Sequence, residues 1–212
     1  MNSWSIENSD PARVEVSRRA KALGITGNPD KAAHALGAIT LADGRVVQAH
    51  VVHAVDPVIT DGKDVVMINR RNDPGQGKPA LPGGFIDPAH GGVESGIQAA
   101  AREAMEEVGV DLGHARATLI GRRNLDRPFD VRVAANDGLK KKYGIESGDI
   151  FMVSTQAVRF DVPDLAQTSL IAGDDAAPGS ARRVRIDSLT RDAVGVPDHF
   201  DMIMAAVADG GG

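Results

Sequence analysis

The sequence predicts an α+β fold in which strands and helices form layers around one core. The main observation is the order of patterns along the 212 residues, where strands are followed by a helix, further strands and a closing helix. The composition, 42% hydrophobic and 25% charged, is that of an ordinary globular protein. No run approaches 18 apolar residues, which excludes a membrane-spanning helix. We expect an N-terminal extension, residues 1–37, and one domain, residues 38–212.

The extension carries helix signals but no visible chemistry. Val14–Leu23 is consistent with a short helix. Asn28 as N-cap, Pro29 at the first helical position and Asp30 at the positive helix end predict a second helix. Gly37 would end that helix as its C-cap. Packing, chain extension and a homodimer contact are the interpretations of this segment.

Strand patterns begin at Ala38, and two turn signals organise them. Ala38–Leu41 and Arg45–Val55 flank Ala42-Asp43-Gly44, and Asp-Gly is a hairpin signal. A second turn, Thr60-Asp61-Gly62-Lys63, leads into Asp64–Asn69, whose apolar run predicts a buried strand. The first part of the domain is therefore expected to consist of strands joined by these two turns.

The remaining elements follow from periodicity and glycine content. Val93–Val108 is the strongest helix pattern, because it is rich in alanine. The polar segment Leu125–Ser147 predicts a long loop. The other expected elements are short strands at Leu81–Ile86, Ala117–Arg122, Ile150–Phe160 and Arg182–Ile186, a loop within Asp161–Gly179, and a closing helix at His199–Ala208.

Charge and cysteine content exclude several classes of function. The net charge of −5 argues against a nucleic-acid-binding protein, which would show a basic excess. The absence of cysteine excludes disulfide scaffolds, thiolate zinc sites and cysteine nucleophiles. The first residues show neither the basic nor the apolar region of a signal peptide. We therefore expect a cytoplasmic protein with no nucleic-acid or membrane partner.

The helix at Val93–Val108 gathers acidic residues on one side. Glu103, Glu106 and Glu107 fall within an arc of about 100° on a helical wheel. The apolar residues expected on nearly the opposite, buried face are Ile97, Ala101, Ala104, Met105 and Val108. One interpretation is a solvated acidic face. The other is a site for divalent cations, because Mg²⁺ prefers oxygen ligands.

A longer pattern around this helix favours the cation site. Gly84 is followed after nine residues by Glu94 and, after seven more, by Arg102-Glu103-Ala104-Met105-Glu106-Glu107-Val108-Gly109-Val110. This resembles the Nudix box of the Nudix hydrolases, G-x5-E-x7-R-E-U-x-E-E-x-G-U, where U is apolar. Every specified position from Glu94 to Val110 matches. The loop before Glu94 is four residues longer than in the family pattern, and only its geometry departs from the resemblance.

The resemblance extends to Val65–Asn69, Arg70-Arg71 and Leu81-Pro82-Gly83-Gly84, which are similar to a family strand and turn. It implies a mixed β-sheet sandwiched between helices (α/β/α), with the box as loop–helix–loop. It also implies Mg²⁺ or Mn²⁺ as the cofactor, held by Glu103, Glu106, Glu107 and the Gly83 carbonyl. In the family pattern Arg102 and Glu94 form a structural pair, and Gly84 and Gly109 complete the box.

The implied reaction is water attack on the pyrophosphate of a nucleoside diphosphate linked to another group. Val55–Thr60 and Ala172–Ala176 resemble segments of ADP-ribose pyrophosphatases, which implies ADP-ribose as substrate and a substrate-side role for Asp174 or Asp175. Arg70 or Arg71 would clamp phosphate, with only one facing the site. The alternatives are a housecleaning hydrolase of modified nucleoside triphosphates and a non-catalytic ADP-ribose sensor.

Overall fold

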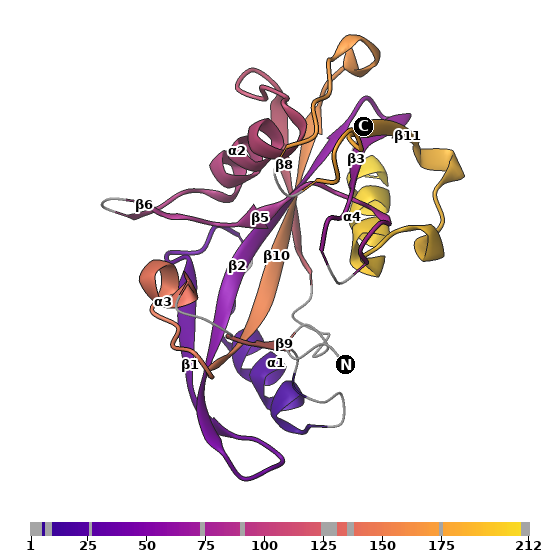
Figure 1. Ribbon diagram of the computed structural model, residues 1–212. Coiled ribbons are helices and arrows are strands. Elements are labelled where there is room, and N and C mark those ends of the chain that lie inside the picture. The colour runs from indigo at the N-terminus through magenta and orange to yellow at the C-terminus, as the bar shows by residue number, and fades with distance from the viewer. Residues whose placement is uncertain are drawn as a thin grey trace. The chain divides into compact units, whose positions relative to one another are not determined.

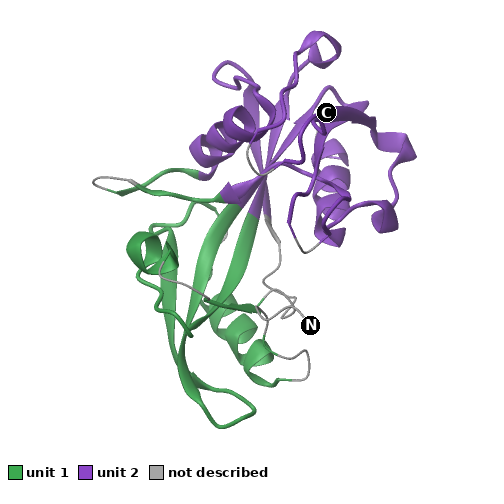
Figure 2. Cartoon of the chain, in the orientation of Figure 1, with its two compact units in different colours: residues 1–54, 85–95, 122–155 green, residues 55–84, 96–121, 156–212 purple. Residues whose placement is uncertain are grey.

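The computed structural model describes residues 6, 10–25, 27–72, 75–89, 92–123, 131–134, 138–173 and 176–208. The chain divides into two compact units (Figure 2). Unit 1 comprises residues 1–54, 85–95 and 122–155, and unit 2 comprises residues 55–84, 96–121 and 156–212. Two long strands, β2 (Val46–Thr60) and β10 (Ile150–Asp161), contribute residues to both units. The predicted domain boundary at 37/38 is not a boundary between these units.

Unit 1 is built on the first halves of β2 and β10. Strand β1 (Ala33–Thr40) pairs antiparallel with β2, and β9 (Val131–Val133) pairs antiparallel with β10. Its remaining elements are α1 (Ala12–Ala22), α3 (Gly138–Tyr143) and a small hairpin of β6 (Pro88–Ala89) and β7 (Gly92–Val93). One core cluster joins residues of α1, β1, β2, β9 and β10.

The predicted helix between Asn28 and Gly37 is wrong. The segment from Ala33 is strand β1, whose backbone is paired with β2 as far as the register Ala33↔Val52. Gly37 has a φ of 85° and sits where the register shifts, so its conformational freedom serves an irregularity in a strand. Arg19 of α1 reinforces the strand, since its Nη1 donates to Leu36 O at 2.8 Å. Tertiary pairing overrides the local capping signals here.

Unit 2 is a layered α+β arrangement, and it confirms the predicted fold class. The sheet order is β11 (Arg182–Arg185), β3 (Asp64–Asn69), β2, β10 and β8 (Arg116–Arg123). Helices α2 (Gly96–Val108) and α4 (Pro197–Ala208) lie on opposite sides of these strands (Figure 1). Side chains of α4 pack against β2, β3 and β10 in one core cluster. The short helical turns are η2 (Leu165–Gln167), η3 (Ile186–Ser188) and η4 (Arg191–Ala193).

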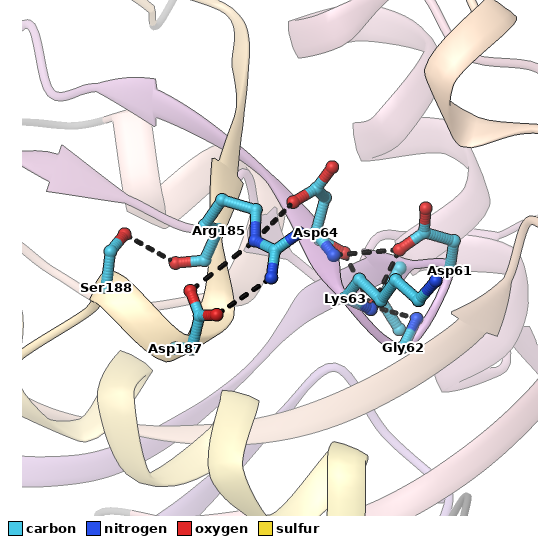
Figure 3. Close-up of polar contacts among 8 residues, drawn as sticks. Asp61, Gly62, Lys63, Asp64, Arg185, Asp187 and Ser188 are labelled. Atoms are coloured by element: carbon cyan, nitrogen blue, oxygen red, sulfur yellow. Dashed lines mark hydrogen bonds and ion pairs between the residues drawn. The ribbon is translucent and has the colours of Figure 1, made fainter.

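The turn between β2 and β3 forms as its sequence predicts (Figure 3). Asp61 Oδ1 accepts the backbone N–H groups of Lys63 at 2.9 Å and Asp64 at 2.7 Å, and Gly62 has a φ of 88°. Beside the turn, Arg185 of β11 forms ion pairs with Asp187 at 2.8 Å and Asp64 at 3.7 Å. The tight turn therefore fixes the register with which β3 enters the sheet.

Most other predicted elements are confirmed, and three differ in addition to the helix between Asn28 and Gly37. Strands near 116–123, 150–161 and 182–185 and the closing helix lie where expected. The helix predicted from Val93 begins at Gly96, because Val93 pairs in the β6–β7 hairpin. Leu81–Ile86 is not one strand but an irregular turn between β4 (Pro79–Ala80) and β5 (Gly84–Phe85). Within the predicted loop Leu125–Ser147, β9 and α3 form. Among the described residues no helix has the length and apolar character of a membrane span.

Candidate active site

Helix α2 turns a different face to the protein interior than its apolar pattern predicts. Glu103 and Glu107 are buried, with exposed fractions of 8% and 5%, whereas Met105 is 48% exposed. The buried positions besides these glutamates are Gly96, Ala99, Ala100, Ala104 and Val108. Small side chains at Ala99 and Ala100 let this face approach its neighbours closely. The prediction that all three glutamates share a face opposite the buried one is therefore wrong, and only Glu106 is exposed.

The Glu103 carboxylate occupies the space that a side chain at Gly84 would need. A Cβ built on Gly84 would lie within 3.0 Å of all three carboxyl atoms of Glu103. Arg102 Nη1 donates to Glu103 Oε1 at 2.7 Å and to Glu106 Oε2 at 3.0 Å. Bare backbone at Gly84 and the Arg102 guanidinium thus hold two of the box carboxylates in place.

Glu107 is linked to the preceding glycine of the same turn. Its Oε2 accepts the Gly83 N–H at 2.8 Å. On the other side of Gly83, a built Cβ would lie within 3.0 Å of Asp56 Oδ1 and of the Val55 carbonyl oxygen. Only glycine therefore fits between Asp56 and Glu107, and the turn brings its backbone against the acidic face of α2.

A buried histidine supports this turn from helix α4. Leu81 N–H donates to His199 Nδ1 at 2.9 Å, and His199 Nε2 lies 3.2 Å from Asp56 Oδ2. His199 is 5% exposed and Asp56 9% exposed. Because Nδ1 accepts a backbone N–H, the ring proton is on Nε2 and is donated to Asp56. Sequence analysis missed His199 as a site residue, since nothing in a closing helix signals a contact with a residue 118 positions away.

The donor set fits a hard divalent cation. The box offers carboxylate oxygens of Glu103, Glu106 and Glu107 and the backbone of Gly83, and Mg²⁺ or Mn²⁺ prefers oxygen ligands. Three glutamates and one arginine leave α2 with a formal charge of −2 at these positions. Among the described residues, no three acidic or histidine side chains stand together in a metal-holding arrangement. In this structure Arg102 hydrogen-bonds to Glu103 and Glu106, and the Gly83 N–H donates to Glu107.

The two arginines after β3 differ in environment. Arg70 is half-buried and pairs with Ala176 across an isolated antiparallel bridge, while Arg71 is exposed. Asp174 and Asp175 lie outside the described residues. The segment before them is tied to α2, since Gly173 N–H donates to the Glu107 carbonyl at 2.9 Å. Arg70 and the residues flanking the two aspartates therefore come from segments that contact each other and α2.

The remaining box residues have structural contacts. Asp87 N–H donates to Glu94 Oε1 at 2.7 Å, and Glu94 N–H donates to Asp87 O at 3.2 Å, all within unit 1. Gly109 has a φ of 69° and its N–H donates to Met105 O at 3.1 Å, which ends α2 with a left-handed cap. The box glycine after the two glutamates thus terminates the helix, and Glu94 closes the inserted hairpin.

Comparison with known proteins shows which family model this part of the chain matches. Residues 51–143, a little under half of the chain, match the family model described as NUDIX domain. A search of curated proteins finds no match. The matched segment is similar to a NUDIX domain, and it contains the turn and the whole acidic helix.

Several solved structures are similar to the chain. A NUDIX hydrolase from Nitrosomonas europaea is 13% identical, covers 82% of this chain and 85% of its own, and has a TM-score of 0.44. A bifunctional NMN adenylyltransferase/ADP ribose pyrophosphatase from Francisella tularensis, complexed with AMP and a Mn ion, is 19% identical, with coverages of 93% and 46% and a TM-score of 0.47. The NUDIX domain of Shewanella oneidensis NrtR, complexed with ADP ribose, is 18% identical, with coverages of 74% and 86% and a TM-score of 0.45. The chain spans about half the length of the Francisella enzyme.

Proposed function

We propose that this protein is a metal-dependent pyrophosphohydrolase that cleaves a nucleoside diphosphate linked to another group. The observation that carries the proposal is the contact of the Pro82–Gly84 turn with α2, where Gly83 binds Glu107 and Gly84 makes room for Glu103. Two buried carboxylates beside bare backbone, on a helix that carries three glutamates and one arginine, offer the oxygen ligands that a divalent cation prefers.

Each box residue has a part that its contacts support. Glu103, Glu106 and Glu107, with the Gly83 carbonyl, would hold Mg²⁺ or Mn²⁺. When bound, such an ion polarises phosphoryl oxygens and lowers the pKa of water. Arg102 orients Glu103 and Glu106 through its two hydrogen bonds. Gly83 donates to Glu107 and so fixes the rotamer of that carboxylate.

The substrate side of the proposal rests on Arg70 and the segment around Asp174 and Asp175. A guanidinium can bind phosphate in a bidentate manner, and half-buried Arg70 suits this better than exposed Arg71. Gly173 is tied to Glu107 and Ala176 is paired with Arg70, which supports a position of this segment beside the acidic helix. With the resemblance of 55–60 and 172–176 to ADP-ribose pyrophosphatases, ADP-ribose is the proposed substrate.

The test is a substrate panel with product identification. Purified protein is incubated with Mg²⁺ and ADP-ribose, dinucleotides or nucleoside triphosphates, and products are separated by anion-exchange chromatography. We expect AMP and ribose 5-phosphate from ADP-ribose, and no turnover with excess chelator until Mg²⁺ or Mn²⁺ is restored. A monophosphate and pyrophosphate released from triphosphates would instead indicate the housecleaning activity. ADP-ribose binding without any turnover would indicate a sensor, and full activity in chelator would refute the metal-dependent reaction.

A further inference from the structure

The backbone of the turn before α2 is held by two side chains from elements far apart in the sequence. Pro82 has no N–H, so the donors at positions 81 to 83 are those of Leu81 and Gly83. Gly83 N–H is bound by Glu107 of the acidic helix. Leu81 N–H is bound by His199 of α4. The turn is therefore hydrogen-bonded to α4 at Leu81 and to the acidic helix at Gly83.

His199 also determines where Asp56 lies. Its Nε2 is 3.2 Å from Asp56 Oδ2, and the other oxygen, Oδ1, fills the space beside the Gly83 α-carbon. Leu81, Asp56 and His199 are all buried. In the interior, a polar atom without a hydrogen-bond partner is strongly destabilising. One imidazole thus satisfies Leu81 through Nδ1 and Asp56 through Nε2, on either side of the same turn.

We propose that His199 is a positioning residue of the cation site, which acts through Leu81 N–H and Asp56 to place the Gly83 backbone against Glu107. This inference rests on the proposed function, because it concerns the affinity of that same site for its metal ion. His199 does not touch the acidic helix in the contacts above, so its effect passes through the turn. Loss of the Nδ1 acceptor releases Leu81, and Gly83 then leaves the position at which it binds Glu107.

Amide substitutions can distinguish the contributions of the two ring nitrogens, Nδ1 and Nε2. In His199→Asn the side-chain oxygen takes the place of Nδ1 and can still accept from Leu81. In His199→Gln the amide NH₂ takes the place of Nε2 and can still donate to Asp56, but Leu81 loses its acceptor. His199→Phe keeps the size of the ring and removes both interactions. Met202→Leu, a change at a fully buried position of the same helix, controls for altered packing of α4.

Mn²⁺ affinity of the full-length protein without substrate, measured by electron paramagnetic resonance, is the primary readout. We expect His199→Phe and His199→Gln to weaken Mn²⁺ binding on the order of 10- to 100-fold, as do losses of groups that orient metal ligands. His199→Asn, which keeps only the Leu81 bond, should weaken binding less than His199→Gln does, and Met202→Leu should bind nearly as the wild type does. In turnover, the Mg²⁺ activation constant should rise in His199→Gln, while the KM for substrate at saturating Mg²⁺ stays unchanged.

Several outcomes would overturn the inference. Folded His199→Phe or His199→Gln with wild-type Mn²⁺ affinity would show that the turn does not depend on His199. Equal losses in His199→Asn and His199→Gln would show that the Leu81 bond is not the route. If the variants fail to fold, ¹⁵N NMR of the wild type decides, because Mg²⁺ must shift the Leu81 amide and the His199 ring nitrogens at the concentrations at which it binds. A wild-type chain that neither binds Mn²⁺ nor hydrolyses nucleotides would refute the proposed function itself.

Discussion

At the scale of single residues, the candidate site is marked by buried carboxylates. Glu103 and Glu107 are among the few buried acidic side chains of the described residues, and both lie beside glycines of one turn. Ordinary helix amphipathicity would place such residues in solvent. Their burial beside bare backbone argues against the interpretation of a solvated acidic face.

Substitution of the box glutamates tests this distinction. We expect Glu107→Gln and Glu106→Gln to lower kcat by roughly 100-fold or more, since the metal ion contributes several kcal/mol to transition-state stabilisation. The amide can still accept the Gly83 N–H, so the melting temperature should be unchanged or slightly higher without metal, because like charges are removed.

The matched control is Glu146→Gln, an exposed glutamate whose partner is Lys140 at 2.8 Å in unit 1. It should leave turnover unchanged. Turnover and thermal unfolding of all three variants, with and without Mg²⁺, provide the measurement. Wild-type turnover in both box variants would mean that α2 is not the metal site.

A second residue-scale prediction concerns pH. The hydrogen bond from Arg18, followed in size by that from Arg19, lowers the pKa of Glu15 from 4.5 to about 2. A carboxyl group whose pKa is lowered by folding stabilises the folded state fully above its unfolded pKa, and that stabilisation is lost as pH falls through its folded pKa. The stability difference between wild type and Glu15→Gln should therefore be constant near neutral pH and shrink between about pH 4.5 and 2.

An NMR titration of the Glu15 side-chain carbon checks this value directly. Arg18→Met should raise the Glu15 pKa toward its ordinary range, because the larger of the two contributions is removed. A wild-type titration midpoint near 4.5 would contradict the ion-paired arrangement on α1.

At the scale of elements, the lengthened loop of the box contains two short paired strands. Strands β6 and β7 pair with the register Pro88↔Val93, and the mutual Asp87–Glu94 hydrogen bonds close its base. The sequence predicts a loop here that is four residues longer than in the family pattern, and His90 and Gly91 lie outside the described residues. The described residues on either side of them are paired, which joins the two ends of the longer loop.

Deletion of residues 89–92 restores the five-residue spacing of the family pattern. We expect the shortened protein to fold with nearly the wild-type melting temperature, because Asp87 and Glu94 can still bind each other across a tighter connection. Circular dichroism and thermal unfolding provide the measurement. As a control, Glu94→Ala should destabilise the full-length protein by about 1–3 kcal/mol, since a partly buried N–H loses its acceptor. Unfolding of the deletion variant would show that the hairpin arms themselves stabilise the fold.

At the scale of the whole molecule, the N-terminal segment is part of a core. Val16 and Ala20 of α1 are buried in the same cluster as Ile39, Val51 and Met152 of strands β1, β2 and β10. β1 also pairs with β2 along its length. Residues 1–37 therefore supply both a helix and a strand edge to unit 1.

Removal of residues 1–37 should unfold or aggregate unit 1, because it exposes apolar residues of β2 and β10 and an unpaired strand edge. A finer comparison uses two valines of α1. Val16→Ala, at a fully buried position, should lower the free energy of unfolding by about 1–3 kcal/mol. Val14→Ala, at a position 63% exposed, should change it by no more than about 0.5 kcal/mol. Equal effects of the two substitutions would contradict the packing of α1.

The sequence by itself determined the features that depend on local pattern. The α+β class, the turns at Asp43-Gly44 and Asp61-Gly62, the extent of β3 and the spacing of the acidic helix could all be predicted. Turn chemistry and periodicity act over a few residues, and a motif with fixed spacing identifies its chemistry before any fold is known.

Only the tertiary structure decided what depends on partners distant in sequence. The segment 33–37 is a strand because β2 offers it a ladder, although its local signals favour a helix. The buried face of α2 includes Glu103 and Glu107 because bare backbone at Gly83 and Gly84 receives their carboxylates. His199 joins the site because α4 brings its ring to Leu81 and Asp56. Burial and long-range hydrogen bonds outweigh local propensity, since each is worth as much as or more than the preferences a short segment expresses.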